Sequence, residues 1–259
     1  FVITAALLLA WPLTATSSDG GYQPLELDSY KVKWGGPVLG KSATVSYALL
    51  DETMRFGEAR NCRQMASLSA LVGGELTRDR LASEAAAAFR VWERAAGLTF
   101  QRVSNAREAD IIVGAQGQPR GRAFANVSYS REAEGASDVR AIKQAQVCLN
   151  PEHSWKIGFD GNRSVYDVRY TLVHEIGHAL GLDHPGSAGQ VMAFRYTEAF
   201  RDLQSGDLLG IRRLYGHGHD DRGPSYDVAA DAEKAASESV ISLAEEEDQP
   251  ASADKSVDG

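Results

Sequence analysis

The sequence is poor in cysteine. It has 259 residues and only two cysteines, Cys62 and Cys148, and neither belongs to a CxxC pair. This excludes a disulfide-rich scaffold, a zinc ribbon and a dithiol redox centre. At most one disulfide can form, which fits an exported protein. A bridge between the two cysteines and buried free thiols both stay open.

Long hydrophobic runs are also missing, so no segment of the sequence is suited to span a bilayer. The most apolar segment, residues 1–13 (FVITAALLLAWPL), has the length of a signal-peptide core and precedes small and polar residues. We therefore interpret residues 1–17 as a signal-peptide-like segment, with a buried helix or a truncated membrane anchor as the alternative. Because no basic residue precedes the apolar run, we expect the natural chain to begin a few residues earlier. These features predict a secreted or periplasmic protein without stable membrane insertion after signal removal.

Basic residues are not concentrated in any part of the sequence. The net charge of −8 is set by residues 216–259, whose twelve acidic and three basic residues sum to −9 and leave +1 for residues 1–215. A nearly neutral main part argues against nucleic-acid binding, which needs a concentrated basic face. Few large apolar side chains occur near the C-terminus, so we predict an acidic disordered tail over residues 218–259. Recruitment of a cationic partner by this tail is a weaker alternative.

The central part of the sequence has the pattern of one α+β domain. With residues 18–29 interpreted as a linker, residues 30–217 are long enough for one domain of catalytic size. Short stretches rich in β-branched and aromatic residues predict about five strands. These strands are expected over residues 43–50, 98–103, 110–115, 122–128 and, less clearly, 145–149.

Three helices are predicted between and after these strands. The first lies between a possible N-cap, Thr77, and Gly97, and its apolar residues recur at helical spacing. The second is expected to begin at Ser164, whose spacing to Asp167 imitates a capping box. The third covers residues 206–215, before a glycine.

The second helix carries the segment HEIGHALGLDH, in which His174 and His178 stand four residues apart. On a helix this spacing places two imidazoles on one face, where both can bind one ion. Glu175 projects beside them, where a carboxylate can take a proton from water instead of binding the ion. Gly181 allows the chain to leave the helix at a positive φ, which returns His184 towards the same point.

Three neutral nitrogen ligands are typical of a catalytic zinc site, because the fourth tetrahedral position is left for water. Zinc in such an open site lowers the pKa of water to about 7. A closed structural site would need a fourth protein ligand, usually cysteine, and the motif contains none. We therefore predict one catalytic Zn²⁺ per chain, held by His174, His178 and His184, with Glu175 as the general base.

The motif HExxHxxGxxH followed by a methionine, here Met192 in HPGSAGQVMAFRY, resembles the metzincin zinc proteases. Within them the sequence is similar to the matrixins, the matrix metalloproteinase group and its bacterial relatives, over roughly residues 30–216. The similar segments are GKSATVSYALL, AAAFRVWERAAGLTFQRVSNAREADIIVG and DLLGIRRLYG. The resemblance implies an α+β zincin domain with a twisted mixed sheet and HExxH on the active-site helix. It also implies a secreted zinc endopeptidase that acts as a monomer on proteins or peptides, such as those of the extracellular matrix.

The resemblance extends to residues expected to bind substrate. Met192 would lie beneath the three imidazoles, and Tyr196 matches a tyrosine that forms a wall of the S1′ pocket in matrixins. Phe194 takes the place of the usual proline in this turn, and a hydrophobic pocket that favours a bulky apolar side chain is expected. The substrate would extend along an edge strand formed by Gly121, Arg122, Ala123, Phe124 and Ala125.

Some matrixin features are missing from the sequence. Between Phe100 and Tyr170 the only histidine is His153, so we predict no second, structural zinc. Calcium binding stays open, because backbone carbonyls could contribute. The propeptide motif PRCGxPD is absent, and the surroundings of Cys62 (ARNCRQM) do not match it. A zinc-blocking role for this thiol is the minor alternative to a disulfide or a buried thiol.

Two other functions remain as alternatives. A serralysin-like protease is suggested by Pro185 directly after His184. Against it, the sequence has Phe194 where serralysins have a tyrosine ligand, and it has no glycine–aspartate repeats. A zinc-containing binding protein that does not cleave is the second alternative. The presence of Glu175 argues against it, because a pure binder needs no base there.

Overall fold

The structure is a computed structural model, and it describes residues 21–118, 120–131 and 137–218. The signal-peptide-like segment 1–17 lies outside the described residues, and so does all but the first residue of the predicted acidic tail, 218–259. In the part that is described, no helix is both long and apolar enough to cross a membrane.

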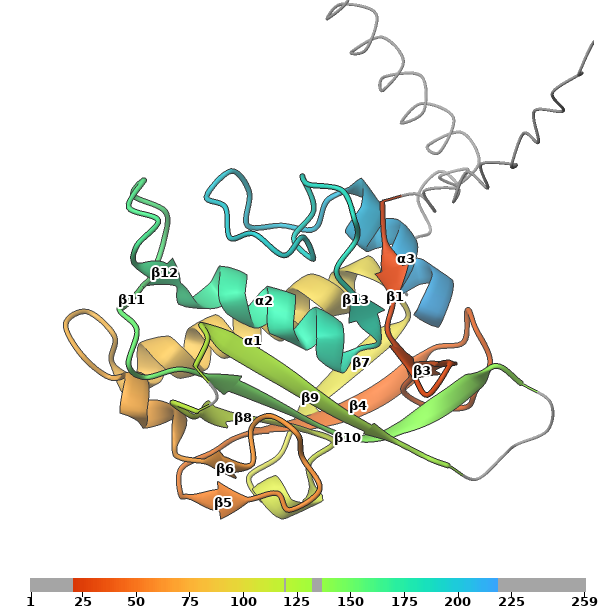
Figure 1. Ribbon diagram of the computed structural model, residues 1–259, viewed down its shortest axis with the longest axis horizontal. Helices are drawn as coiled ribbons and strands as arrows, with labels where there is room; N and C mark the ends of the chain where they lie inside the picture. Colours follow the sequence, from red (N-terminus) through yellow and green to blue (C-terminus); the bar gives the residue numbers. More distant parts are fainter. Residues whose placement is uncertain (1–20, 119, 132–136, 219–259) are drawn as a thin grey trace, which may run out of the picture.

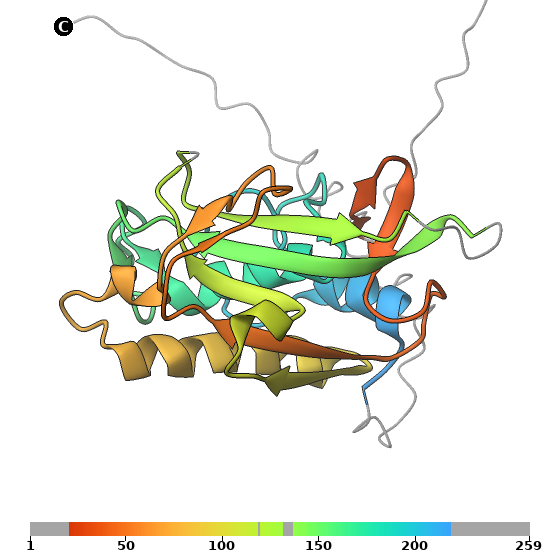
Figure 2. The ribbon, with the colours of Figure 1, turned by 90° about the horizontal axis from the view of Figure 1, so that it is seen from below.

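The described residues form a mixed sheet of seven strands (Figure 1). In sheet order these are β2 (Glu26–Leu27), β3 (Tyr30–Lys33), β10 (Val139–Leu149), β8 (Ile111–Ala115), β4 (Ala43–Leu49) and β7 (Leu98–Arg102), with β9 (Ala123–Tyr129) paired to β10. From β3 to β7 all neighbours are parallel, whereas β2 and β9 are antiparallel to their partners. Figure 2 shows β9 beside β10, its only strand partner among the described residues. The other edge of β9 is therefore available to a further strand.

Three two-stranded pairs lie outside this sheet. They are β1 (Gln23–Pro24) with β13 (Leu182–Asp183), β5 (Met54–Arg55) with β6 (Gln64–Met65), and β11 (Trp155–Lys156) with β12 (Tyr166–Asp167). The segment expected to be a linker, 18–29, therefore contributes β1 and β2, which pair with β13 and β3.

The main strands agree with the sequence prediction, with two kinds of difference. Strands β2 and β3 were not predicted, and β10 begins at Val139, six residues before the expected start at residue 145. Charged residues in β3 and at the start of β10 obscure the strand pattern in the sequence. The Arg140 guanidinium lies 3.8 Å from the centre of the Tyr30 ring. The ammonium of Lys33, although fully buried, donates to the carbonyls of Trp34 and Gly36.

Three α-helices lie within the described ranges, on one side of the sheet (Figure 1). They are α1 (Arg78–Ala95), α2 (Val168–Ala179) and α3 (Ser205–Tyr215), and two short 3₁₀ helices cover Leu68–Leu71 and Ala106–Glu108. The predicted start of the second helix at Ser164 is wrong. Asp167 is the N-cap, because its carboxylate accepts the N–H of Tyr170 at 2.7 Å. The N–H of Ser164 instead donates to the side chain of Asn162 in the preceding loop.

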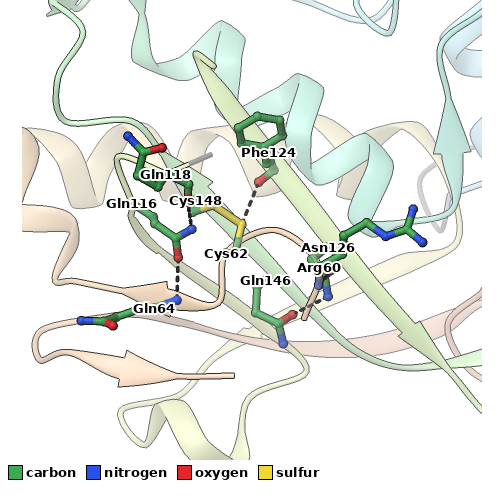
Figure 3. The surroundings of a disulfide bond; sticks show 9 residues. All are labelled: Arg60, Cys62, Gln64, Gln116, Gln118, Phe124, Asn126, Gln146 and Cys148. Atoms are coloured by element: carbon green, nitrogen blue, oxygen red, sulfur yellow. Dashed lines mark hydrogen bonds between the residues drawn. A yellow bond between two sulfur atoms is a disulfide. The ribbon is translucent and has the colours of Figure 1, made fainter. Parts of the chain in front are cut away.

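The opposite side of the sheet carries a second, smaller core under the β5–β6 hairpin. A disulfide joins Cys62 in the hairpin loop to Cys148 in β10 (Figure 3). The same loop is held to β9, because the N–H of Arg60 donates to the Asn126 side chain at 2.8 Å. Of the alternatives that the sequence left open for the cysteines, the structure has the bridge. Cys62 is therefore not a free thiol that could block a metal.

We predict that the disulfide contributes substantially to stability, because it closes a loop with a sequence separation of 86 residues. Replacing Cys62 and Cys148 together by serine should lower the free energy of unfolding by about 2–5 kcal/mol. Urea denaturation followed by tryptophan fluorescence measures this change. Reductant should move the wild-type midpoint towards that of the double variant and leave the variant unchanged. Equal midpoints for both proteins without reductant would contradict the prediction.

Candidate metal centre

Helix α2 carries His174 and Glu175, which are buried, and His178, which is partly buried. It packs against α1 on one side and β9 on the other. The indole N–H of Trp92 in α1 donates to the carbonyl of Val173 at 2.9 Å, which fixes the two helices against each other. The side chains of α2 that face β9 therefore have defined positions.

The C-terminal end of α2 is closed by side chains from other elements. The indole N–H of Trp34 donates to the carbonyl of Ala179 at 2.8 Å, and the hydroxyl of Tyr215 donates to that of Leu180 at 2.7 Å. These contacts satisfy two carbonyls that the helix itself leaves unpaired. The helix end is therefore fixed by contacts with distant parts of the chain.

Gly181 reverses the chain directly after this end. Its φ is +99°, and a Cβ at this position would lie 2.0 Å from the carbonyl oxygen of Val32. The expected positive φ is confirmed, and the contact with β3 adds a second reason why only glycine fits. Strand β13 follows, and His184 comes directly after it.

The reversal brings the three histidines together. The Nε2 atoms of His174, His178 and His184 are 3.1–3.2 Å from one another. The Nδ1 atom of His174 is 2.7 Å from the carbonyl oxygen of Val191, and that of His178 is 2.8 Å from the carbonyl oxygen of Leu182. A carbonyl only accepts, so both Nδ1 atoms carry hydrogen, and both Nε2 atoms present lone pairs.

This arrangement fits a bound cation. Lone pairs that converge at this distance repel one another unless an electron-pair acceptor lies among them. The spacing suits an ion at 2.0–2.1 Å from each nitrogen, the usual Zn–N distance. Burial lowers the pKa of His178 to about 4 and that of His174 well below its usual value, which keeps both rings neutral. Among the residues that the structure describes, no fourth protein ligand joins the cluster, which leaves a coordination position open.

Glu175 is almost fully buried beside this cluster. Burial raises the pKa of its carboxyl group to about 7, and the nearby cation of Arg122 partly opposes the increase. The carboxylate does not belong to the three-histidine cluster. Burial therefore makes this carboxylate more basic than an exposed one.

Met192 is buried against α2, close to Gly177. It is 2 % exposed, and a Cβ built on Gly177 would lie 2.3 Å from its sulfur. The buried carboxylate of Asp207 accepts the N–H groups of Val191 at 2.8 Å and Met192 at 3.0 Å. The sequence did not reveal this role of Asp207, whose only signal is its place in the first turn of the third helix.

A groove of about 1200 Å³ runs along β9 past the histidines and Glu175. All five residues predicted for the edge strand, 121–125, line it. The loop 56–61 of the β5–β6 hairpin forms part of the lining as well. Sequence reasoning missed this loop, because its position depends on the disulfide and on the contact with Asn126.

The two residues predicted for a specificity pocket lie in different surroundings. Phe194 is 74 % exposed, and its ring is edge-on to His184 with centres 5.2 Å apart. Tyr196 packs edge-on against Tyr166 and Tyr170 at 5.3 and 5.1 Å. We call these three tyrosines the tyrosine cluster. The Tyr196 hydroxyl accepts the N–H of Asp167 and donates to a carboxylate, so its ring is fixed.

Comparison with known proteins agrees with this geometry. A sequence profile described as matrixin matches residues 68–216. The probable matrix metalloproteinase 095L of Invertebrate iridescent virus 3 is 30% identical over 137 residues. Matrix metalloproteinase-16 of Homo sapiens is 32% identical over 148 residues, and karilysin of Tannerella forsythia is 28% identical over 141 residues.

These similarities cover part of each protein. The matched regions are 49%, 50% and 53% of this chain for the viral protein, the human protein and karilysin. They are 35%, 23% and 29% of those proteins in the same order. The chain therefore spans about a quarter to a third of the length of these relatives.

We predict that Gly177→Ala disturbs the support of the histidines. The added methyl group would overlap the Met192 sulfur and come within 2.8 Å of the Trp92 ring. Overpacking of this kind typically costs about 1–3 kcal/mol. Thermal or urea denaturation would detect the loss. Gly186→Ala is the matched control, because nothing lies within 4 Å of its added Cβ. Equal stability of the two variants would contradict the packing argument.

Proposed function

The chain belongs to the matrixin family, and from this premise we propose that it is a zinc-dependent endopeptidase. The observation that carries the proposal is the convergence of three imidazole Nε2 atoms beside a buried carboxylate, at the edge of an open strand. Family membership favours this function over the serralysin-like alternative. The proposed ligands all come from one chain, so activity as a monomer is consistent with the site.

We assign zinc binding to His174, His178 and His184. When bound, zinc supplies a Lewis acid that polarises a peptide carbonyl and acidifies water at the open position. The carbonyl oxygens of Val191 and Leu182 orient two of the rings through Nδ1–H. Such outer contacts fix the tautomer and the direction of the ligand nitrogen.

Glu175 is proposed as the general base. Its raised pKa makes the carboxylate basic enough to accept the proton of the attacking water near neutral pH. The same carboxyl group can then deliver that proton to the nitrogen of the leaving amine. Two proton transfers by one residue are consistent with its burial beside the groove, where bulk water has little access.

The substrate is proposed to lie along β9 in an extended conformation. One edge of β9 is hydrogen-bonded to β10, and the groove follows the strand. Addition of a strand provides affinity through the backbone and leaves the side chains to set preference. Tyr196 and Phe194 are proposed to border the position of the residue that follows the scissile bond.

The protein is proposed to act outside the cytoplasm. The disulfide supports this location, because such bonds persist mainly in oxidising compartments. The signal-peptide-like nature of residues 1–17 and the disorder of the acidic tail remain predictions from the sequence. Proteins or peptides of the extracellular space are the proposed substrates.

Metal content tests the proposed ligand set. We expect close to one zinc per chain by elemental analysis after dialysis, because one complete ligand set is present in the described residues. A strong chelator should abolish hydrolysis of a denatured protein substrate, and added zinc should restore it if the apo fold survives. Two tightly bound zinc ions would contradict the single site, and hydrolysis in the chelator would contradict the metalloprotease.

Glu175→Ala should separate metal binding from catalysis. General base catalysis typically contributes about 10²- to 10⁴-fold, so turnover should fall at least a hundredfold while zinc content stays near wild type. Glu175→Gln, which preserves the volume, should behave in the same way. His178→Ala is the contrasting variant and should lose zinc and activity together. Retention of more than about a tenth of the activity by both Glu175 variants would disprove the assigned base.

A further inference from the structure

Arg122 occupies a position where the groove meets the tyrosine cluster. The residue directly precedes β9 and lines the groove. Its guanidinium carbon is 5.1 Å from the centre of the Tyr166 ring and 5.5 Å from that of Tyr196. Two aromatic rings therefore hold the cation beside Glu175, whose pKa it lowers.

The Arg122 side chain lacks a hydrogen-bonding partner among the described residues. Its Nε atom is buried without a hydrogen bond, and no carboxylate of the described chain lies within ion-pair distance. Cation–π contacts stabilise the charge but do not satisfy the N–H donors. Buried polar groups usually have a partner, and a ligand that enters the groove is in a position to provide one.

The two acidic residues that are hydrogen-bonded to the tyrosine cluster already form ion pairs with other cations. Glu198, which accepts the Tyr196 hydroxyl, is 2.5 Å from the ammonium of Lys156. Asp167 is 2.9 Å from the guanidinium of Arg201. Neither carboxylate is therefore available to neutralise Arg122.

A carboxylate is the ligand that best matches this group. Guanidinium presents paired N–H donors that a carboxylate accepts in a bidentate geometry, and charge-assisted hydrogen bonds of this kind are strong. An apolar side chain in the same place would remove the N–H donors from water without replacing their hydrogen bonds. The cation therefore changes the chemistry expected from Tyr196 and Phe194 alone.

We propose that Arg122 binds a carboxylate of the substrate at the position that follows the scissile bond. The position is inferred from Tyr196, which the proposed function places beside that substrate residue and whose ring lies against the Arg122 guanidinium. The inference rests on the proposed protease function. The carboxylate belongs either to an aspartate or glutamate side chain or to the C-terminus of a substrate cut one residue before its end.

Peptides that differ only at this position provide the test. One series carries glutamate, glutamine or leucine after the scissile bond, in the middle of an amidated peptide. We expect kcat/KM for glutamate to exceed those for glutamine and leucine by at least about tenfold, mainly through KM. A second pair has leucine as the last residue, with a free or an amidated C-terminus. Preference for the free form would identify the terminal carboxylate as the source.

Substitutions of Arg122 test whether this residue causes the preference for a carboxylate. Arg122→Met should abolish the advantage of the charged peptide, and Arg122→Glu should favour a lysine peptide instead. Arg131→Gln is the matched control, because Arg131 also lines the groove and is exposed. It should leave the ratio between the glutamate and glutamine peptides unchanged.

Binding measurements separate this inference from the protease function. Fluorescence anisotropy with the Glu175→Ala variant should show tighter binding of carboxylate peptides, lost on adding Arg122→Met. If no peptide is cut but this difference appears, the protease function fails and the carboxylate site stands. If peptides are cut with equal or better rates for leucine than for any carboxylate form, the inference is overturned. An equal loss for all peptides in Arg122→Met would likewise overturn it.

Discussion

The reversal of the chain at Gly181 is the constraint on which the candidate site depends. Two histidines are fixed by their spacing on α2, but the third joins them only if the helix ends at once and the chain turns back. The backbone at Gly181 lies so close to Val32 that a side chain has no room. Its carbonyl accepts the N–H of Leu25, and β13 pairs with β1. The N-terminal strands therefore take part in building the metal centre, although they are distant from it in sequence.

A second set of contacts, from α3 through the turn that contains Met192, supports the histidine cluster. Asp207 in α3 accepts two backbone N–H groups of the turn that contains Met192, and the carbonyl of Val191 in that turn orients His174. The methionine sulfur fills the space left by the missing side chain of Gly177. The Asp207 carboxylate in α3 thus fixes the His174 ring in α2 through the turn that lies between the two helices in the sequence. Because each link is a short contact between buried groups, the geometry of the cluster depends on the position of α3 as well as on that of α2.

Local sequence patterns predicted the parts of the structure that depend on local physics. Helical spacing predicted which histidines share a face, and a β-rich composition predicted β4, β7, β8 and β9 within one residue at each end. The observed sheet also contains β2 and β3. These strands were not predicted, because their polar and charged residues obscure the strand pattern. The start of α2 was wrong because Asp167, and not Ser164, accepts the N–H of the first turn. Asp207 and the loop 56–61 could not be found in this way, since their positions follow from contacts between distant segments.

The charges around the groove help to explain how Glu175 can be buried and still be ionised. Burial alone raises the pKa of the Glu175 carboxyl, whereas the cation of Arg122 lowers it. A metal ion at the histidines would act in the same direction as Arg122, because each positive charge favours the carboxylate. Arg122 therefore helps to keep Glu175 ionised, and a substrate carboxylate that neutralised Arg122 would weaken this effect. In the proposed mechanism, binding of a substrate carboxylate would then raise the pKa of Glu175 while the peptide bond lies beside it, which would couple recognition of charge to cleavage.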